Sequence, residues 1–438
     1  MRARRGSWGG PALAAVVVAL VATGCSSGAS SSTTTTRAPS TSTAVAGTSS
    51  AAPGVTATQI TIGAIESKTG PLAGYFNGLG PGMNAYFQMI DAQGGINGRK
   101  LVLAYDLDDG GQPSQYTQQV HTLIDQDHVF AVGAASVWFT PNYFVATKTP
   151  TYGYNVSSNW QGAPNLFAAG GSTQSYSTGV PTLAYFIRKT NSKSIAASYD
   201  ACNTYQKLLK QAGYNVSFVD VGAQLGGSYS SDVQRMQQAG ADMVFSCMQA
   251  SDNITLSRDI QQYGLKTKQL WVNGYDQTLL DQYQGVMQGV YLDNTGTLPF
   301  EAADTAKFGN TYSGMQQYIA AMKKYEPAFT YNGVALQGWQ SAALIAAGVR
   351  AAGADLTQAN VIAQTNKITD FNGAGVSAPV NWTVVHTGAT LPNCSAFVQV
   401  QGDSFVPVFG QGKQIFVCLG ASVKNPVPVT PPPGTPGA

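Results

Sequence analysis

The chain has 438 residues, of which 44% are hydrophobic and 11% are charged. This length exceeds that of one ordinary domain, and 49 glycines with so few charges suit an extracellular α/β protein better than a cytosolic helical one. Lys and Arg total 24 against 22 Asp and Glu, and no basic patch marks a phosphate-binding surface, which argues against nucleic acid as a partner.

The first 24 residues have the layout of an export signal. Arg2, Arg4 and Arg5 form a positive start, and a short apolar segment, residues 11–22, leads to Cys25. The stretch Ala22-Thr23-Gly24-Cys25 resembles a bacterial lipobox. This resemblance implies cleavage before Cys25 and a diacylglycerol on its thiol, with the protein anchored on the extracytoplasmic face of the cell membrane. A plain secretory signal is the alternative, since the segment is too short to span a hydrocarbon layer of about 30 Å.

Two segments have compositions that do not build a core. Residues 25–54 are almost entirely Ser, Thr, Ala, Gly and Pro after the cysteine, which predicts a disordered tether. Residues 423–438 form a Pro-rich tail that we also expect to lack fixed structure.

Four cysteines remain once Cys25 carries lipid, and an even number in an exported chain favours disulfides. Cys394 and Cys418 flank alternating segments that predict a hairpin. Cys202 and Cys247 each follow a predicted strand, and these two strands would be neighbours in a doubly wound sheet. We therefore predict the disulfides Cys202–Cys247 and Cys394–Cys418, with buried free thiols as the alternative. No cysteine spacing matches a zinc site, and we expect no metal and no cofactor.

From residue 58 the chain alternates short β-branched runs with amphipathic stretches, which predicts parallel sheets covered by helices. The first series of strands covers residues 59–65, 100–105, 129–132 and 149–154. A second series covers residues 194–199, 215–221, 243–247 and 269–272. The sequence therefore predicts an α/β fold of two doubly wound lobes.

Two long helical patterns, residues 314–325 and 333–352, follow the second series. They exceed what the second sheet needs, so we expect the chain to return to the first lobe before it finishes on the second. We assign residues 55–186 and 296–376 to the first lobe. The second lobe takes residues 187–295 and 377–422.

Several short motifs follow one another in an order and at spacings that match a known protein family. They are residues 55–63, Gly70-Pro71-Leu72-Ala73-Gly74-Tyr75, residues 91–100, Asp108-Asp109-Gly110-Gly111-Gln112-Pro113 and residues 373–382. Together they resemble the leucine/isoleucine/valine-binding family of ABC-importer receptors, over about residues 55–410. The resemblance implies the periplasmic-binding-protein type I fold, in which crossing hinge strands join two lobes and the ligand lies in the cleft between them.

Ligands of open α/β sheets bind beyond the carboxyl ends of the strands. In the first lobe this rule selects Tyr75, Ser136, Trp138, Ser157 and Ser158. Hydroxyl donors suit a carboxylate, and the resemblance implies that Ser136 and Ser158 hold the acidic end of the ligand. The alternative for each serine is an ordinary cap or turn residue.

In the second lobe the same rule selects Asp200, Gln249, Tyr275 and Asp276. A bound ammonium group needs a facing carboxylate, because a buried unpaired charge costs several kcal/mol. Asp276 is the first choice for this role and Asp200 the second. The second lobe departs from the family pattern, so the ligand could also be an amide, a short peptide or an aromatic acid. Trp138 favours a ligand with a flat or apolar part.

These observations predict a monomeric, extracytoplasmic solute-binding lipoprotein of an ABC importer. Its ligand would be a branched-chain amino acid or a related small polar molecule, and an ABC permease its membrane partner. The absence of a paired histidine and nucleophile argues against an enzyme. The alternatives are a ligand sensor that signals to a membrane partner and a secreted α/β hydrolase or amidase.

Overall fold

The computed structural model describes residues 52–70, 72–155, 157–169, 179–198, 203–220, 226–387 and 393–438. Cys25, Asp200 and Cys202 lie outside these ranges, as do the predicted signal and most of the predicted tether. In the described part of the chain, no helix has both the length and the apolar run needed to cross a membrane.

The first sheet has five parallel strands in the order β2-β1-β3-β4-β5. Its strands are β1 (Gln59–Glu66), β2 (Lys100–Asp108), β3 (Ala131–Ala135), β4 (Thr151–Gly153) and β5 (Leu166–Ala168). Both faces of β1 are covered, since Ile60 and Ile62 pack into one apolar cluster and Ile65 into another. The β-branched runs of the sequence thus become central strands that are buried on both sides.

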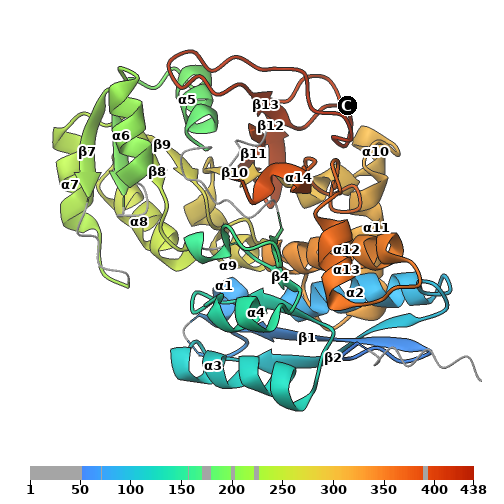
Figure 1. Cartoon of the computed structure of the whole chain (residues 1–438). Helices are drawn as coiled ribbons and strands as arrows, with labels where there is room; N and C mark the ends of the chain where they lie inside the picture. Colours follow the sequence, from blue (N-terminus) through green and yellow to red (C-terminus); the bar gives the residue numbers. More distant parts are fainter. Residues whose placement is uncertain are drawn as a thin grey trace, which may run out of the picture. The chain divides into compact units, whose positions relative to one another are not determined.

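Helices cover both faces of this sheet. They are α2 (Leu79–Asp91), α3 (Pro113–His121) with the π-helical turn Thr122–Gln126, α4 (Asn142–Thr147), α11 (Ser313–Tyr325), α12 (Gly333–Ala352) and α13 (Gln358–Thr365). Figure 1 shows α2 and α12 on one side of the sheet and α3 on the other, in agreement with the two apolar clusters.

Glycines let α2 and α12 approach closely. A Cβ atom on Gly82 would lie 1.9 Å from the carbonyl oxygen of Ala335, and one on Gly338 would lie 2.1 Å from that of Leu79. Each helix therefore places a glycine against the backbone of the other, and only a residue without a side chain fits there.

The second sheet has eight strands in the order β12-β11-β10-β9-β8-β6-β7, with β13 also paired to β11. Its strands are β6 (Ile195–Ser198), β7 (Val216–Asp220), β8 (Met243–Ser246), β9 (Lys268–Trp271), β10 (Tyr291–Thr295), β11 (Asn393–Gln401), β12 (Ser404–Val408) and β13 (Val417–Leu419). Its helices are α5 (Val180–Lys189), α6 (Asn203–Gln211), α7 (Ser230–Gln238), α8 (Ala250–Gln262) and α9 (Gln277–Met287). The predicted hairpin is confirmed, because β11 and β12 pair antiparallel up to Gln401 and Ser404.

The chain crosses between the two lobes after β10. It builds α11, α12 and α13 on the first sheet and returns to the second sheet as β11. The crossing segments bond to one another: Leu298 N–H donates to the Val376 carbonyl at 2.8 Å, and Ala378 N–H donates to the Gly296 carbonyl at 2.9 Å. These segments form the hinge.

Two segments differ from the lobe boundaries that the sequence suggested. Helix α5 begins before residue 186, yet its apolar face packs in the cluster of the second sheet, where Phe186 contacts Phe397. The short helix α14 (Trp382–Val385) follows residue 377, yet Trp382 packs edge-on against Phe167 of β5, in the first lobe. The sheet on which each helix packs depends on tertiary contacts that the sequence pattern does not contain.

Four further short helical segments lie at strand ends and near the hinge. They are α1 (Ala73–Phe76), η2 (Ser158–Trp160), η4 (Phe300–Ala303) and α10 (Thr305–Phe308).

The Pro-rich tail does not match the expectation of disorder. Val429 N–H donates to the Cys418 carbonyl at 2.8 Å, and the Asn372 side-chain amide donates to the Gly434 carbonyl at 3.0 Å. Thr435 is only 5% exposed. Figure 1 shows the tail in red, passing from beside α5 to a terminus near α10.

Candidate functional site

The first-lobe candidates lie at the edge of the five-stranded sheet that is formed by the carboxyl ends of its strands. Tyr75 is in α1 after β1, Ser136 and Trp138 directly follow β3, and Ser157 and Ser158 follow β4. Because β1, β3 and β4 are adjacent and parallel, their carboxyl ends meet at this edge. The structure therefore brings these five residues to the same side of the lobe.

Ser136 makes bonds within the protein. It is 1% exposed, its hydroxyl donates to Asp109 Oδ2 at 2.5 Å, and its Oγ accepts the Trp138 N–H at 3.1 Å. The Ser136 hydroxyl proton is thus already donated to Asp109, in the turn after β2. Ser158 is exposed at the start of η2.

Two other hydroxyls at this edge are buried and have no hydrogen-bond partner among the described residues. They belong to Ser157, after β4, and to Ser67, directly after β1. Buried polar groups are almost always bonded to protein or water, so an unsatisfied hydroxyl at a strand end is a donor available to something outside the fold. The sequence analysis selected Ser157 but missed Ser67, which directly follows the last residue of β1.

The second-lobe candidates lie at the carboxyl ends of β8 and β9. Gln249 is the N-cap residue of α8, and its side chain makes no capping bond there. Asp276 is the N-cap of α9, where its Oδ1 accepts the Leu279 N–H at 3.0 Å. Burial raises the pKa of Asp276, while bonds from Leu279 and Thr278 oppose that rise. Its carboxylate therefore serves the helix start, and Asp200 lies outside the described residues.

Two contacts join the edges of the two lobes. The Tyr75 hydroxyl lies 2.5 Å from Ser251 Oγ, in the first turn of α8. The Tyr275 hydroxyl donates to Glu301 Oε2 at 2.8 Å and accepts the Phe300 N–H. Tyr275 was expected to face a ligand, but its hydroxyl instead forms hydrogen bonds with Glu301 and Phe300 of η4.

The ring of Tyr275 is also enclosed. It stacks on Phe300 at 5.0 Å between centroids and lies 4.7 Å from Phe405 of β12. Burial raises the pKa of Glu301 to about 7, with bonds from Tyr275 and from backbone N–H groups acting in the opposite direction. The junction thus contains a carboxyl group that titrates near neutral pH. Sequence reasoning missed Glu301 because it belongs to no strand end.

A second buried carboxyl group lies behind the first-lobe edge. Glu66, the last residue of β1, is fully buried and accepts the N–H groups of Gly78, Leu79 and Gly80 at the start of α2, at 2.6, 2.6 and 3.3 Å. Burial and then the nearby Asp106 raise its pKa to about 8, against the pull of those N–H groups and of Lys68.

Asp106 completes this cluster. Lys68 Nζ lies 2.5 Å from its Oδ2, and burial raises the pKa of Asp106 despite that bond. Two carboxyl groups therefore share one cation, which favours a proton on the more buried member, Glu66. The cluster fixes the loop that carries Ser67 and leads to Tyr75.

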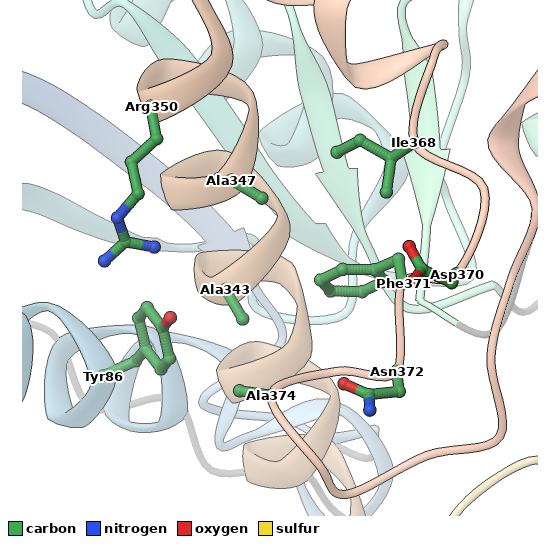
Figure 2. A pocket seen from close by; sticks show the side chains of 9 residues that line it. All are labelled: Tyr86, Ala343, Ala347, Arg350, Ile368, Asp370, Phe371, Asn372 and Ala374. Atoms are coloured by element: carbon green, nitrogen blue, oxygen red, sulfur yellow. The ribbon is translucent and has the colours of Figure 1, made fainter. Parts of the chain in front are cut away.

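A pocket lies away from these residues, between α2, α12 and residues 368–374 (Figure 2). Its volume is about 270 Å³, and its lining includes Tyr86, Arg350, Asp370, Phe371 and Asn372. It contains none of the residues selected from the sequence. Among the described residues, no group of three or more His, Cys, Asp or Glu side chains could hold a metal ion.

The structure contains the predicted disulfide Cys394–Cys418. The two residues are paired directly across β11 and β13, with their Cα atoms 3.9 Å apart. The bond therefore joins β11 to a third strand and does not close the β11–β12 hairpin. Cys247 is also disulfide-bonded. Its predicted partner, Cys202, lies outside the described residues, so that pairing stays a prediction.

Comparison with known proteins identifies the family. Residues 59–404 match the family model described as periplasmic binding protein. The Leu/Ile/Val-binding protein homolog 3 of Brucella melitensis is 24% identical over 310 residues, which cover 67% of this chain and 79% of that protein.

Solved structures agree. A fatty acid ABC transporter substrate-binding protein from Thermomonospora curvata superposes with a TM-score of 0.70 at 17% identity, covering 88% of this chain and 98% of that one. A branched chain amino acid ABC transporter protein from Thermus thermophilus with bound valine gives 0.65 at 16% identity, covering 80% and 95%. The chain therefore belongs to the periplasmic binding protein family and has the two-lobed type I fold.

Proposed function

We propose that this chain is the extracytoplasmic solute-binding lipoprotein of an ABC importer. In this proposal it binds one small carboxylic acid, an amino acid or a related acid, between its lobes. The observation that carries the proposal is a contact between residues at the carboxyl ends of strands in the two sheets. The hydroxyl of Tyr75, which follows β1, lies beside that of Ser251, which follows β8. Loops of both lobes surround a ligand only when such edges face each other.

The free hydroxyls support a carboxylate as the recognised group. Ser67 and Ser157 are buried donors without partners in the described part of the fold, and a hydroxyl bonds more strongly to an anion than to a neutral acceptor. A carboxylate is also the group that valine and a fatty acid, named for two of the similar structures, have in common. We therefore assign the acidic end of the ligand to Ser157 and Ser67 in place of Ser136 and Ser158.

The rest of the ligand contacts amide and aromatic side chains in this proposal. Gln249, half-buried and free of side-chain capping bonds, lies at the start of α8, two residues before Ser251, which contacts the first lobe. Trp138 is 37% exposed at the opposite edge. Burying part of that ring against a ligand would contribute about 25 cal/mol per Å² of apolar area.

Matched ligand pairs test the proposal. Valine and 3-methylbutanoate differ only in the α-ammonium group, and leucine and 4-methylpentanoate form a second such pair. In thermal-shift titrations, a true ligand at 100 times its Kd should stabilise the protein by about 2.7 kcal/mol. If no carboxylic acid of this size shifts unfolding, the proposed ligand class is wrong.

Serine variants test the placement of the carboxylate. With the ligand found in that screen, Ser157→Ala should weaken binding by about 1 to 3 kcal/mol in calorimetry, because a donor to a charge is lost. Ser114→Ala, an exposed serine at the start of α3, is the matched control and should bind normally. Equal affinity of the two variants would contradict the assignment.

The lipid anchor has a separate test. The lipobox-like stretch and the Ser/Thr-rich segment after it support attachment at Cys25. In cell fractionation, the wild type should sediment with membranes and Cys25→Ser should not. A Cys25→Ser protein that stays wholly in the membrane fraction would refute the anchor while leaving the binding proposal intact.

A further inference from the structure

The C-terminal strap, residues 423–438, begins on the second lobe. The Tyr214 hydroxyl donates to the Val423 carbonyl at 3.1 Å, and Arg188 Nη1 donates to Asn425 Oδ1 at 2.9 Å. Next, Pro428 pairs with Leu419 of β13. This strand is held to β11 by the Cys394–Cys418 disulfide, so the start of the strap is fixed covalently to the second sheet.

The end of the strap lies on the first lobe. The Asn372 side-chain amide donates to the Gly434 carbonyl at 3.0 Å. Gly437 fits against the phenol of Tyr312, directly before α11, where an added Cβ atom would lie 2.6 Å from the hydroxyl oxygen. Helix α11 packs on α2, which places this contact on the first lobe.

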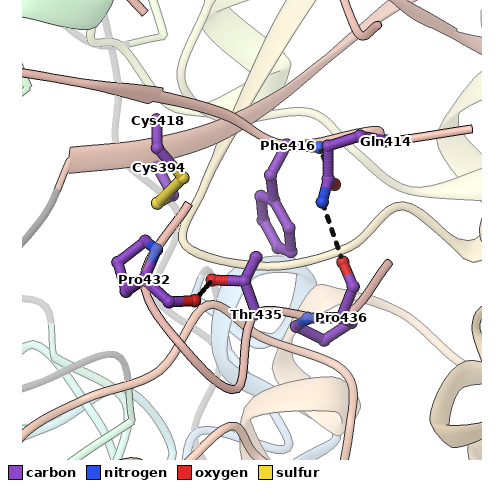
Figure 3. The surroundings of a disulfide bond; sticks show 7 residues. All are labelled: Cys394, Gln414, Phe416, Cys418, Pro432, Thr435 and Pro436. Carbon is purple, nitrogen blue, oxygen red and sulfur yellow. Dashed lines mark hydrogen bonds between the residues drawn. A yellow bond between two sulfur atoms is a disulfide. The ribbon is translucent and has the colours of Figure 1, made fainter. Parts of the chain in front are cut away.

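The last turn of the strap is closely packed. Thr435 is 5% exposed, and its hydroxyl donates to the Pro432 carbonyl at 2.6 Å. Gln414 Nε2 donates to the Pro436 carbonyl at 3.3 Å. Figure 3 shows this turn beside Phe416 and Gln414, next to the disulfide.

The composition of the strap makes it stiff. It contains six prolines, and proline-rich chain prefers an extended form with a rise of about 3.1 Å per residue. Proline also limits the freedom of the undocked chain, so docking loses little conformational entropy. A segment of this kind transmits tension between its two ends, whereas a glycine-rich segment would stretch.

We propose that the strap limits how far the two lobes open about the hinge. Its start is bound to the second lobe, and its last turn contacts Asn372 and Tyr312 of the first lobe as well as Gln414, which lies between β12 and β13 of the second lobe. Opening must therefore either stretch the strap or detach its last turn from Asn372 and Tyr312. The ligand-free protein thus keeps its lobes within a restricted range of angles. This property of the fold does not depend on which ligand the protein binds.

Distance measurement between the lobes tests the proposal without any ligand. Spin labels at Gln118→Cys on α3 and Gln237→Cys on α7, both exposed, report the separation in a mature protein that carries Cys25→Ser. Thr435→Glu places a charge in the buried turn and should detach it. Val427→Glu, at a residue 53% exposed on the same strap, is the matched control.

We expect a narrow distance distribution in the wild type and in Val427→Glu, and a broader one shifted to longer distances in Thr435→Glu. Equal distributions in a folded Thr435→Glu protein would overturn the proposal. Should that variant fail to fold, Asn372→Ala combined with Gln414→Ala removes two donors to the strap without burying a charge. A distribution unchanged from wild type in that double variant would refute the strap equally.

Discussion

Replacing Glu301 with Gln should flatten the dependence of stability on pH. Burial raises the pKa of Glu301 from 4.5 to about 7, a difference that corresponds to about 3 kcal/mol. Because the folded pKa is the higher one, the contribution is fully present below about pH 4.5 and is lost as pH rises through about 7. Glu301→Gln cannot ionise, yet its amide oxygen still accepts the Tyr275 hydroxyl.

Urea unfolding at pH 5 and pH 8, followed by tryptophan fluorescence, measures this effect. The free energy of unfolding of the wild type, relative to Glu301→Gln, should fall by up to about 3 kcal/mol between these pH values. Other groups that titrate in this range, Glu66 among them, are present in both proteins and cancel in the difference. Parallel pH profiles for the two proteins would refute a buried carboxyl group at the junction.

Three further predictions concern stability, each measured by urea unfolding. Glu66→Ala leaves three N–H groups at the start of α2 without their acceptor and should cost at least about 2 kcal/mol, more than Glu66→Gln; equal losses would contradict this role. Replacing both Cys394 and Cys418 with Ser should cost about 3 kcal/mol for a disulfide that links residues 24 apart, and an unchanged midpoint would exclude that contribution. Gly82→Ala should cost about 2 to 4 kcal/mol, because its methyl group would overlap the Ala335 carbonyl; a neutral result would mean that α2 and α12 can separate.

The strands and the hairpin were predictable because their signals are local. Ile60 and Ile62 alternate on one face of β1, and Gln401-Gly402-Asp403 separates two alternating runs that pair as β11 and β12. The same pattern suggested the pairing of Cys394 with Cys418, but not that their disulfide joins β11 to the third strand, β13. Such signals need only the residues next to one another in the chain.

The side-chain partners at the site were not predictable in this way. Ser136 lies at the expected strand end, but its proton goes to Asp109, 27 residues earlier, and Tyr275 likewise bonds to Glu301. A strand-end rule places a residue at an edge without telling whether it faces a ligand or a neighbouring loop. The tail escaped prediction for a related reason, since its composition carries no signal of the contacts that Asn372 and Tyr312 provide.

The long return of the chain to its first lobe has a consequence for folding. Helix α2 ends at Asp91, but α12, which covers it, begins only at Gly333, so a major part of the first-lobe core joins segments more than 200 residues apart. Such high contact order slows folding, and a chain still emerging from a ribosome or a translocon holds an uncovered sheet face until residue 352 is free. The first lobe therefore cannot finish folding before strands β6 to β10 of the second have been synthesised, and premature collapse of the uncovered β3 and β4 is the hazard that assisting chaperones would have to prevent.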